Sequence, residues 1–224
     1  MAIRGYSPVR FVKKYMVTQE LFRVGEEDWS AQKVSAKVLE RMMWIVENSL
    51  GEKPKRAIVT HPAYFDALAI NATREAAELA GLDVTDGLMM EPIAAAMAYT
   101  QGDDRSQIRV LVYDLGGGTF DITLVDRTSG SFKPLAFGGN RELGGYNFDK
   151  KIATKMLAQI REKGFQLNID PNHPERDIRW ASLMHHAEQV KIDLTQKPKA
   201  VMRKSGVFTD DSPSPKSVQL NFTM

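Results

Sequence analysis

A glycine-rich string with a carboxylate on each side, VLVYDLGGGTFDITLVD, occupies residues 110–126. Its chemically useful members are Asp114, Gly116, Gly117, Gly118, Thr119 and Asp121. Glycines adopt backbone conformations that are closed to other residues, and successive N–H groups in such a turn can bind an anion such as phosphate. The Thr119 hydroxyl can bond a terminal phosphate or a nearby water. The string therefore predicts a phosphate-binding loop.

The two aspartates indicate a metal ion. Carboxylates beside a phosphate repel it unless a cation lies between them. Mg²⁺ fits this role because it keeps several waters and is held by one or two carboxylates together with phosphate oxygens. We therefore expect a nucleoside triphosphate with Mg²⁺ flanked by Asp114 and Asp121. The simpler alternative is a glycine-rich hairpin that carries Asp121 on a solvated face.

Two common phosphate motifs do not describe this loop. The sequence contains no G-x-x-x-x-G-K-[ST] string, and a G-x-G-x-x-G fingerprint needs a glycine where Asp121 stands. That fingerprint also leads from a strand into a helix. Here a continuous apolar strand (Val110–Tyr113) precedes the glycines, and residues 120–125 alternate with the period of a two-faced strand. A third strand is expected over Phe132–Phe137.

Upstream of the loop, strand-like and helix-like segments alternate. Arg56–His61 reads as a strand, residues 71–82 as a helix and Val84–Met90 as an extended segment. A helix is expected over residues 91–99, since Pro92 suits a first helical turn. This order points to an α/β layer with a mostly parallel sheet.

Both ends of the chain add further elements. The apolar residues that recur at helical spacing after Ser30 share one face, and Gly51 is a plausible stop; they are Val34, Val38, Met42, Ile45 and Val46. Short strands are expected before them, at Arg10–Val12, Tyr15–Thr18 and Glu20–Val24. Beyond residue 142 the pattern predicts two helices, with Phe148, Ile152, Met156 and Ile160 on one face of the first, and then strand, polar turn and strand.

Composition excludes several classes of protein. The 224 residues carry 30 basic and 28 acidic side chains, which gives no electrostatic case for nucleic acid. Lys13 and Lys14 are interpreted as a solvated basic pair. There is no cysteine, so disulfides, cysteine-ligated zinc and thiol catalysis are excluded. No apolar run is long enough to span a membrane, and a cytoplasmic protein is expected.

The string YDLGGGTFDITLVD closely resembles the second phosphate loop of the seventy-kilodalton heat-shock (DnaK-type) chaperones, which belong to the actin-like ATPase superfamily. Further segments resemble the same family in the same order: AIVTHPAYFDALAINATREAAELAGLDV, EPIAAAMAY and LGGYNFDKKI. The resemblance spans Glu26 to the C-terminus. It implies an α/β chain with the actin-like, ribonuclease H-like fold, a role in protein folding and stress response, and ATP or ADP with Mg²⁺ as cofactors.

The resemblance also assigns roles to residues. Asp114 and Asp121 match the acidic residues that hold hydrated Mg²⁺, and Gly116 to Thr119 match the phosphate cradle. Glu91 matches the carboxylate that orients the hydrolytic water, and the helix dipole at its position keeps a carboxylate ionised. The residues matched to adenosine contacts are Gly144, Gly145, Glu188, Lys191 and Thr195. By spacing, the last three share one helical face; without the resemblance, a polar helix exterior is the simpler interpretation.

The chain also departs from the family pattern. The first phosphate loop, the lysine after it, the late adenosine loop and the peptide-binding domain have no recognised counterpart, so a nucleotide-binding domain truncated at both ends is expected. Its parts are expected over 1–29 (first upper subdomain), 30–103 (first lower lobe), 104–143 (second lower lobe) and 144–224 (second upper lobe). Ile192, Ile70 and His61 replace an adenine-stacking arginine, an interdomain arginine and a valine.

Three functional alternatives remain. The parent protein is expected to be an ATP-driven chaperone whose partners are client peptides, J-domain co-chaperones and nucleotide-exchange factors. The chain can instead be a non-catalytic interaction module, which Ile192 and the missing first loop favour. Another actin-like protein, a filament protein or a sugar kinase, is the third. Exposed sheet edges in the lower lobes are expected to permit association.

Overall fold

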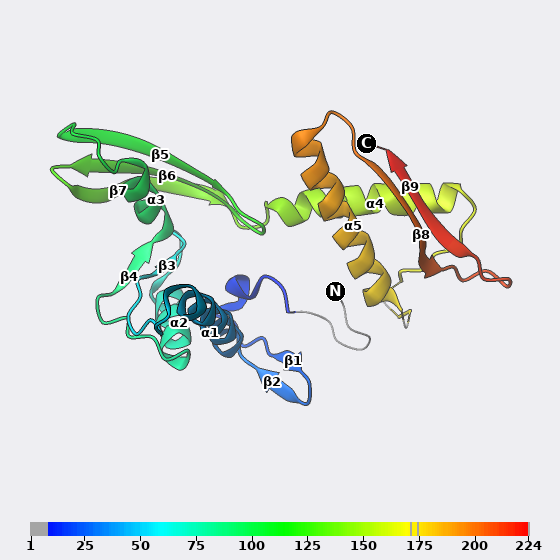
Figure 1. Cartoon of the computed structure of the whole chain (residues 1–224), viewed down its shortest axis with the longest axis horizontal. Helices are drawn as coiled ribbons and strands as arrows, with labels where there is room; N and C mark the ends of the chain where they lie inside the picture. The colour runs from blue at the N-terminus through cyan, green and yellow to red at the C-terminus, as the bar shows by residue number, and fades with distance from the viewer. Residues whose placement is uncertain (1–8, 171, 174, 224) are drawn as a thin grey trace. The chain divides into compact units, whose positions relative to one another are not determined.

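The computed structural model describes residues 9–170, 172–173 and 175–223 and divides them into two compact units. The first unit is Val9–Arg141, and the second runs from Glu142 to the end of the described chain. Figure 1 shows the elements of each unit, with a three-stranded sheet in the first and a long two-stranded hairpin in the second. The four-part division expected from the resemblance stays a prediction, and residues 1–8 of its first part lie outside the described residues.

The three helices of the first unit begin where the sequence provides caps. α1 (Ala31–Leu50) starts after Ser30, whose side chain accepts a hydrogen bond from the N–H of Lys33, and ends at Gly51 with φ of 79°. The Asp66 side chain caps α2 (Ala67–Leu79) in the same way. α3 (Glu91–Tyr99) carries a proline in its first turn. The three helices expected in this region are therefore confirmed.

The shared apolar face of α1 is largely exposed. Val38, Met42 and Ile45 are about half exposed, whereas the buried residues of this helix are Ala31, Ala36 and Met43. The spacing of the apolar residues correctly predicts the helix, but it cannot tell which face of the helix a neighbouring element covers. The two helices α1 and α2 pack through small residues such as Ala36 and Ala77.

The N-terminal segment corrects two of the expected strands. Val12–Tyr15 forms a 3-10 helix, η1, and only Phe22–Val24 (β1) and Glu27–Trp29 (β2) pair as strands. The predicted strands at Arg10–Val12 and Tyr15–Thr18 are wrong. Phe11 adopts a left-handed conformation with φ of 57°, and local turns take up the backbone groups that a strand would use. Composition typical of β-structure is a weak signal where no strand lies alongside.

A short parallel pair positions the first candidate side chain. β3 (Val59–His61) and β4 (Leu88–Met90) run parallel, with α2 as the connection between them. Because α3 follows β4 without a loop, Glu91 stands at the carboxyl end of a parallel strand. A site at this end of the strands is the usual arrangement in α/β sheets.

The glycine string lies in an antiparallel meander of β5 (Gln107–Leu115), β6 (Phe120–Thr128) and β7 (Ser131–Asn140). The strand–glycine–strand order is therefore confirmed, and all three strands extend beyond their predicted bounds. Of the four sheets in the described residues, only β3–β4 is parallel, so the expectation of a mostly parallel sheet applies to that pair alone. The fold class is a mixture of α and β elements, as expected.

The second unit contains helices α4 (Gly145–Glu162) and α5 (Arg176–Gln196), followed by the hairpin of β8 (Val201–Thr209) and β9 (Ser217–Thr223). Ile152, Met156 and Ile160 of the predicted apolar face are buried in its core, while Phe148 stays 42% exposed. Both predicted helices and the strand–turn–strand tail are confirmed. None of the described helices combines the length and apolar content needed to cross a membrane.

Candidate functional site

A four-residue glycine loop joins β5 to β6 and sets the two aspartates side by side. The N–H of Gly116 donates to the carbonyl oxygen of Thr119 at 2.9 Å, which closes the loop. In the strand register Asp114 lies directly opposite Asp121. Directly opposed residues on antiparallel strands project to the same face, with Cβ atoms about 5 Å apart. The two carboxylates therefore share one side of the sheet at the mouth of the loop.

Two of the three glycines, Gly116 and Gly118, serve close approach, and none of the three serves an unusual backbone angle. None of them has a φ in the left-handed region, which corrects the expectation that their conformations are closed to other residues. A Cβ on Gly118 would lie 3.1 Å from Cδ1 of Phe11, and one on Gly116 would lie 3.3 Å from the oxygen of Thr119. Gly117 faces open space. The loop is thus lined by bare backbone and lets the segment around Phe11 pass next to it.

Gly139 is a functional position that sequence reasoning missed. It lies opposite Asp121 in the β6–β7 register and has a φ of 155°. A Cβ there would lie 2.2 Å from the carbonyl oxygen of Phe120 and 3.1 Å from Cα of Asp121. Only glycine lets β7 run this close behind the aspartate. The Gly138–Gly139 pair in the sequence was the available signal.

Burial raises the pKa of Asp121 above its usual range. Hydrogen bonding by Thr119, whose Oγ1 donates to Oδ2 at 3.1 Å, and the charge of Lys13 oppose that rise. The negative charges of Asp114 and Glu91 add to it. A carboxylate surrounded in this way is stabilised by an added cation.

Lys13 supplies a cation that sequence reasoning had placed in a solvated pair. Its Nζ lies 2.8 Å from Oε1 and 3.0 Å from Oε2 of Glu91, and η1 holds it there. The Lys13 side chain is 44% exposed and that of Glu91 is 27% exposed, so the ion pair contributes at most about 1 kcal/mol to stability. The ion pair matters for the site rather than for stability, because it brings the positive charge of Lys13 to Glu91, the expected water-orienting carboxylate. The available signal in the sequence was Glu91 itself, a carboxylate at the start of α3 that has no basic residue close to it in the sequence.

Lys13 and Glu91 also help to line an apolar cavity of about 300 Å³. Its other lining residues are mainly apolar and come from η1, α1, β3 and α2. The glycine loop and both aspartates are absent from its lining. The cavity and the phosphate loop are therefore separate features that share the Lys13–Glu91 pair.

The arrangement of donors suits hydrated Mg²⁺. Asp114 and Asp121 are two carboxylates on one face, and Thr119 adds a hydroxyl. The described residues contain no group of three or more histidine, cysteine, aspartate or glutamate side chains that could enclose a metal. A cation that keeps most of its waters and takes its remaining ligands from phosphate needs no such enclosure. The residues present therefore fit Mg²⁺ bound together with a phosphate group.

The residues expected near adenosine belong to the second unit and are described by themselves. Lys191 of α5 pairs with Asp149 of α4 at 2.8 Å, and its Nζ also lies 3.4 Å from the oxygen of Gly145. The N–H of Gly144 donates to Oδ1 of Asn147 at 2.9 Å, which caps α4. Lys191 thus joins the two helices where the glycine pair begins the first of them.

Glu188 and Thr195 are exposed on α5, and the Thr195 hydroxyl donates to the carbonyl oxygen of Ile192 at 2.7 Å. Ile192 is 48% exposed, so an apolar side chain stands on the surface of this helix.

In the first unit, His61 is buried and its Nδ1 lies 2.9 Å from the oxygen of Pro62. Ile70 is partly buried on α2. The roles expected for His61, Ile70, Glu188, Ile192 and Thr195 therefore stay predictions.

Comparison with known proteins adds an independent finding. Residues 8–220 match the family model described as Hsp70 protein. A chaperone protein DnaK of Metamycoplasma hominis is 37% identical over 84% of this chain and 31% of its own length. A chaperone protein DnaK of Mycoplasmopsis agalactiae is 32% identical over 94% of this chain and 34% of its own length. The chain spans about a third of the length of these relatives.

Proposed function

Because this chain belongs to the Hsp70 family, we propose that it forms the phosphate- and magnesium-binding part of the nucleotide site of a heat-shock-type chaperone. The observation that carries the proposal is the opposed pair Asp114 and Asp121 at the mouth of the glycine loop, with Lys13 and Glu91 beside them. The actin-like ATPase arrangement of lobes, with the boundaries expected from the sequence, is part of the same proposal.

Each side chain has a distinct task in this proposal. Asp114 and Asp121 hold hydrated Mg²⁺, which offsets the phosphate charge. The bare backbone of Gly116 to Gly118 admits phosphate oxygens, and the Thr119 hydroxyl contacts the outermost phosphate or a nearby water. Glu91 orients the attacking water, and Lys13 adds a positive charge beside it. Phosphoryl transfer of this kind depends on positioning and electrostatics and needs no covalent intermediate.

Adenosine recognition falls to the second unit. Gly144, Gly145, Glu188, Lys191 and Thr195 remain its candidates. Lys191 is already paired with Asp149, so we expect Glu188 and Thr195 to make most of the polar contacts. An arginine stacked on adenine would supply about 1 kcal/mol, and Ile192 cannot provide that interaction. We therefore expect weak nucleotide binding.

ATP hydrolysis, client peptide binding and the response to J-domain co-chaperones and nucleotide-exchange factors are proposed for the whole protein. The 224 residues contain one recognisable phosphate loop, so we expect this chain alone to hydrolyse ATP negligibly. Association through the free edge of β3 is also expected, since β3 pairs only with β4 among the described strands. The non-catalytic interaction module stays the second candidate, supported by the exposed Ile192.

Titration calorimetry of the chain with ATP, with and without Mg²⁺, tests the proposal. We expect weak binding that depends on Mg²⁺ in the wild type and loses this dependence in Asp114→Asn and Asp121→Asn. Asp126→Asn, on the same strand as Asp121 and paired with Arg109, is the matched control and should bind as the wild type does. Identical binding in all four proteins would favour the non-catalytic module. ATP turnover above background that disappears in Asp114→Ala would contradict the expected inactivity.

A further inference from the structure

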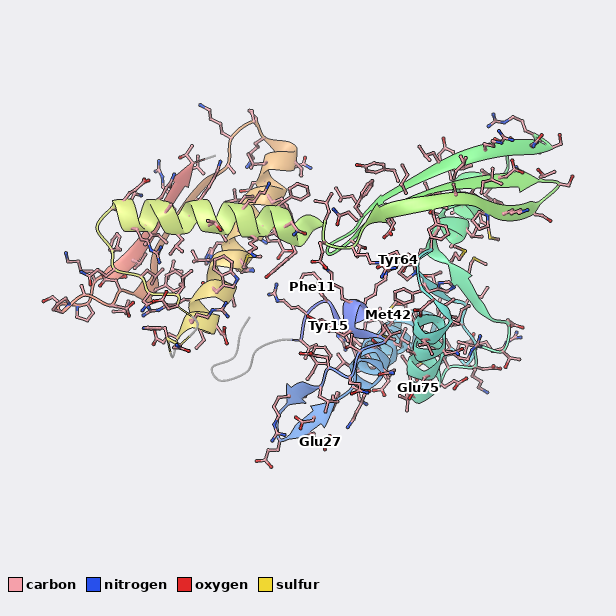
Figure 2. The ribbon with its side chains drawn as sticks, turned by 180° about the vertical axis from the view of Figure 1, so that it is seen from behind. Phe11, Tyr15, Glu27, Met42, Tyr64 and Glu75 are labelled. Atoms are coloured by element: carbon pink, nitrogen blue, oxygen red, sulfur yellow. The ribbon has the colours of Figure 1, made fainter. Side chains whose placement is uncertain are left out.

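β5 is an edge strand without the features that usually prevent an edge from pairing. Among the described strands it pairs only with β6. Its register with β6 is regular over all nine residues, from Gln107 to Leu115, and the strand contains no proline, glycine or lysine. Figure 1 shows β5 along one side of the meander, and Figure 2 shows the same sheet from behind with its side chains. A long, regular and apolar edge of this kind is a template for another strand.

The opposite edge of the same sheet, β7, is protected. β7 contains Lys133, Pro134 and Gly139, and its register with β6 shifts between Leu124 and Val125. Proline lacks the N–H group that pairing needs, and a register shift bends the edge away from a partner. Because both edges belong to one three-stranded sheet, the difference between them isolates β5 as the edge open to association.

Two hydrogen bonds at the ends of the β5–β6 ladder show which backbone groups of β5 face outward. The N–H of Ser129 donates to the carbonyl oxygen of Ser106 at 2.9 Å, and the N–H of Gly116 donates to that of Thr119 at 2.9 Å. Hydrogen-bonded pairs alternate with non-bonded pairs along an antiparallel ladder. The even-numbered residues of β5 therefore direct their N–H and C=O groups to β6, and the odd-numbered residues from 107 to 115 direct theirs to the free edge.

A groove of about 560 Å³ lies beside this strand. It is lined by residues 108–112 of β5, by Arg105, and by Ala95 and Tyr99 of α3. None of its lining residues belongs to β6 or β7, so the groove lies on the outer side of β5. Leu111 of this strand is 61% exposed. The edge thus offers both backbone hydrogen-bonding groups and apolar side chains to a strand that lies against it.

The sequence of β5 complements a second copy of itself. When two β5 strands run antiparallel with Leu111 opposite Leu111, all nine residues of each strand have a partner. The odd-numbered residues then face each other, so the outward N–H and C=O groups of the two strands can bond. Arg109 lies opposite Tyr113 of the second copy, which permits a cation–π contact. Asp114 lies opposite Ile108, so no like charges meet. A register shifted by two residues leaves the strand ends unpaired.

We propose that β5 is the interface of a symmetric homodimer, in which two β5 strands pair antiparallel about a two-fold axis at Leu111. The three-stranded sheets of the two copies then form one continuous antiparallel sheet. Such an interface is isologous, so each contact occurs twice. The match of length, charge and outward backbone groups favours a second copy over an unrelated extended peptide. The dimer is independent of the proposed nucleotide site and uses a different edge from that of β3.

Sedimentation equilibrium of the full chain tests the proposal. We expect the wild type to dimerise at micromolar concentrations. Leu111→Lys places two ammonium groups opposite each other and removes apolar contact at the axis, so it should weaken association roughly tenfold or more. Leu135→Lys, at an exposed leucine of β7, is the matched control and should associate as the wild type does. Far-ultraviolet circular dichroism checks that both variants fold. A monomeric wild type would overturn the proposal and leave the edge to a peptide from another protein.

A charge pair tests the register itself, because only a residue at the axis meets its own copy. Leu111→Glu alone should also be monomeric, whereas an equal mixture of Leu111→Lys and Leu111→Glu should form a heterodimer. The chain has no cysteine, so mild oxidation of Leu111→Cys should give a disulfide-linked dimer, and oxidation of Leu135→Cys should not. A mixture that stays monomeric would overturn the proposed register. Association that persists in every Leu111 variant would place the interface elsewhere, the edge of β3 included, and would overturn the proposal.

Discussion

Asp211 in the second unit and Asp121 in the first belong to the same chemical class, yet their pKa values move in opposite directions. Hydrogen bonds from Arg179 lower the pKa of Asp211 to about 2, whereas burial raises that of Asp121. Arg179 donates to Asp211 at 2.6 and 2.8 Å and also to the carbonyl oxygens of Asn168 and Thr209. Every charge in that network has a partner. Around Asp121, by contrast, the carboxylates of Asp121, Asp114 and Glu91 lie near one cation, Lys13, and one threonine hydroxyl. An added cation would therefore stabilise this region.

The two units also differ in how completely they bury their apolar side chains. The buried side chains of α4, α5 and the β8–β9 hairpin join in one core. The first unit has two smaller clusters and leaves large apolar side chains on its surface. They include Val38, Met42, Trp44, Ile45, Tyr113 and Phe137. The second unit also exposes large apolar side chains, among them Ile178, Ile192 and Val201, but most of its apolar side chains share one core. The first unit lacks such a single core and presents more apolar surface that a ligand or another protein segment can cover.

Substitution of Gly139 by alanine should have the largest effect and tests how tightly the Asp121 region is built. A Cβ at 2.2 Å from the oxygen of Phe120, together with the positive φ, forces β7 away from β6. We expect the free energy of unfolding, measured by urea denaturation, to fall by about 3 kcal/mol. Gly206→Ala in the second unit is the matched control, since its φ is 70° but its Cβ would meet nothing closer than 3.7 Å. Its cost should be about 1 kcal/mol; equal losses would mean that close approach at Gly139 is unimportant.

Replacement of Arg179 by alanine should break the paired network of the second unit. The Arg179 side chain is 5% exposed, and its loss removes the charged partner of Asp211, which keeps a hydrogen bond from the N–H of Asn168, and the donor to two carbonyl oxygens. We expect a loss of about 2 kcal/mol in the free energy of unfolding, because Asp211 keeps some access to water. Arg176→Ala, on the same helix and paired with the adjacent Asp177 at the surface, should change stability little. A loss of similar size in Arg176→Ala would contradict this account.

The sequence predicted most of the elements and the loop, but not the contacts that place the loop. Ser30 and Pro92 act locally, so the helices they begin could be recognised. The helix expected over residues 71–82 was recognised by its composition, but the Asp66 cap was missed, and the helix begins earlier, at Ala67. Lys13 and Gly139 were not recognised as part of the site, because each acts on a residue distant in sequence, Glu91 or Asp121, and the local signals did not name that partner. The glycines of the loop were expected for the wrong reason. Backbone freedom can be inferred from residue type, whereas close approach depends on which segment passes nearby.

Acid should weaken the second unit through Asp211. The folded pKa of Asp211, about 2, lies below the ordinary value of about 3.9. The stability that Asp211 contributes is therefore fully present above about pH 4 and is lost as the pH falls toward 2. Screening by solvent limits this contribution to about 1 kcal/mol. The difference in urea midpoint between the wild type and Arg179→Gln should shrink over this window; a constant difference would mean that Arg179 acts through its carbonyl contacts alone.

Asp121→Asn should have the smallest and opposite effect. The pKa of Asp121 is raised in the folded chain, so ionisation of this carboxylate weakens the fold as the pH rises through its unfolded value, and the cost is complete at neutral pH. Asparagine removes that charge while keeping the shape. We expect the metal-free chain to gain about 0.5 kcal/mol in a urea titration at neutral pH, a figure already reduced for solvent exposure. Asp126→Asn on the same strand should not stabilise the chain, because hydrogen bonds from Thr128 and Arg109 lower the pKa of Asp126. If both variants lower stability, the carboxylates of the first unit are held as firmly as Asp211, and the need for a cation at the glycine loop disappears.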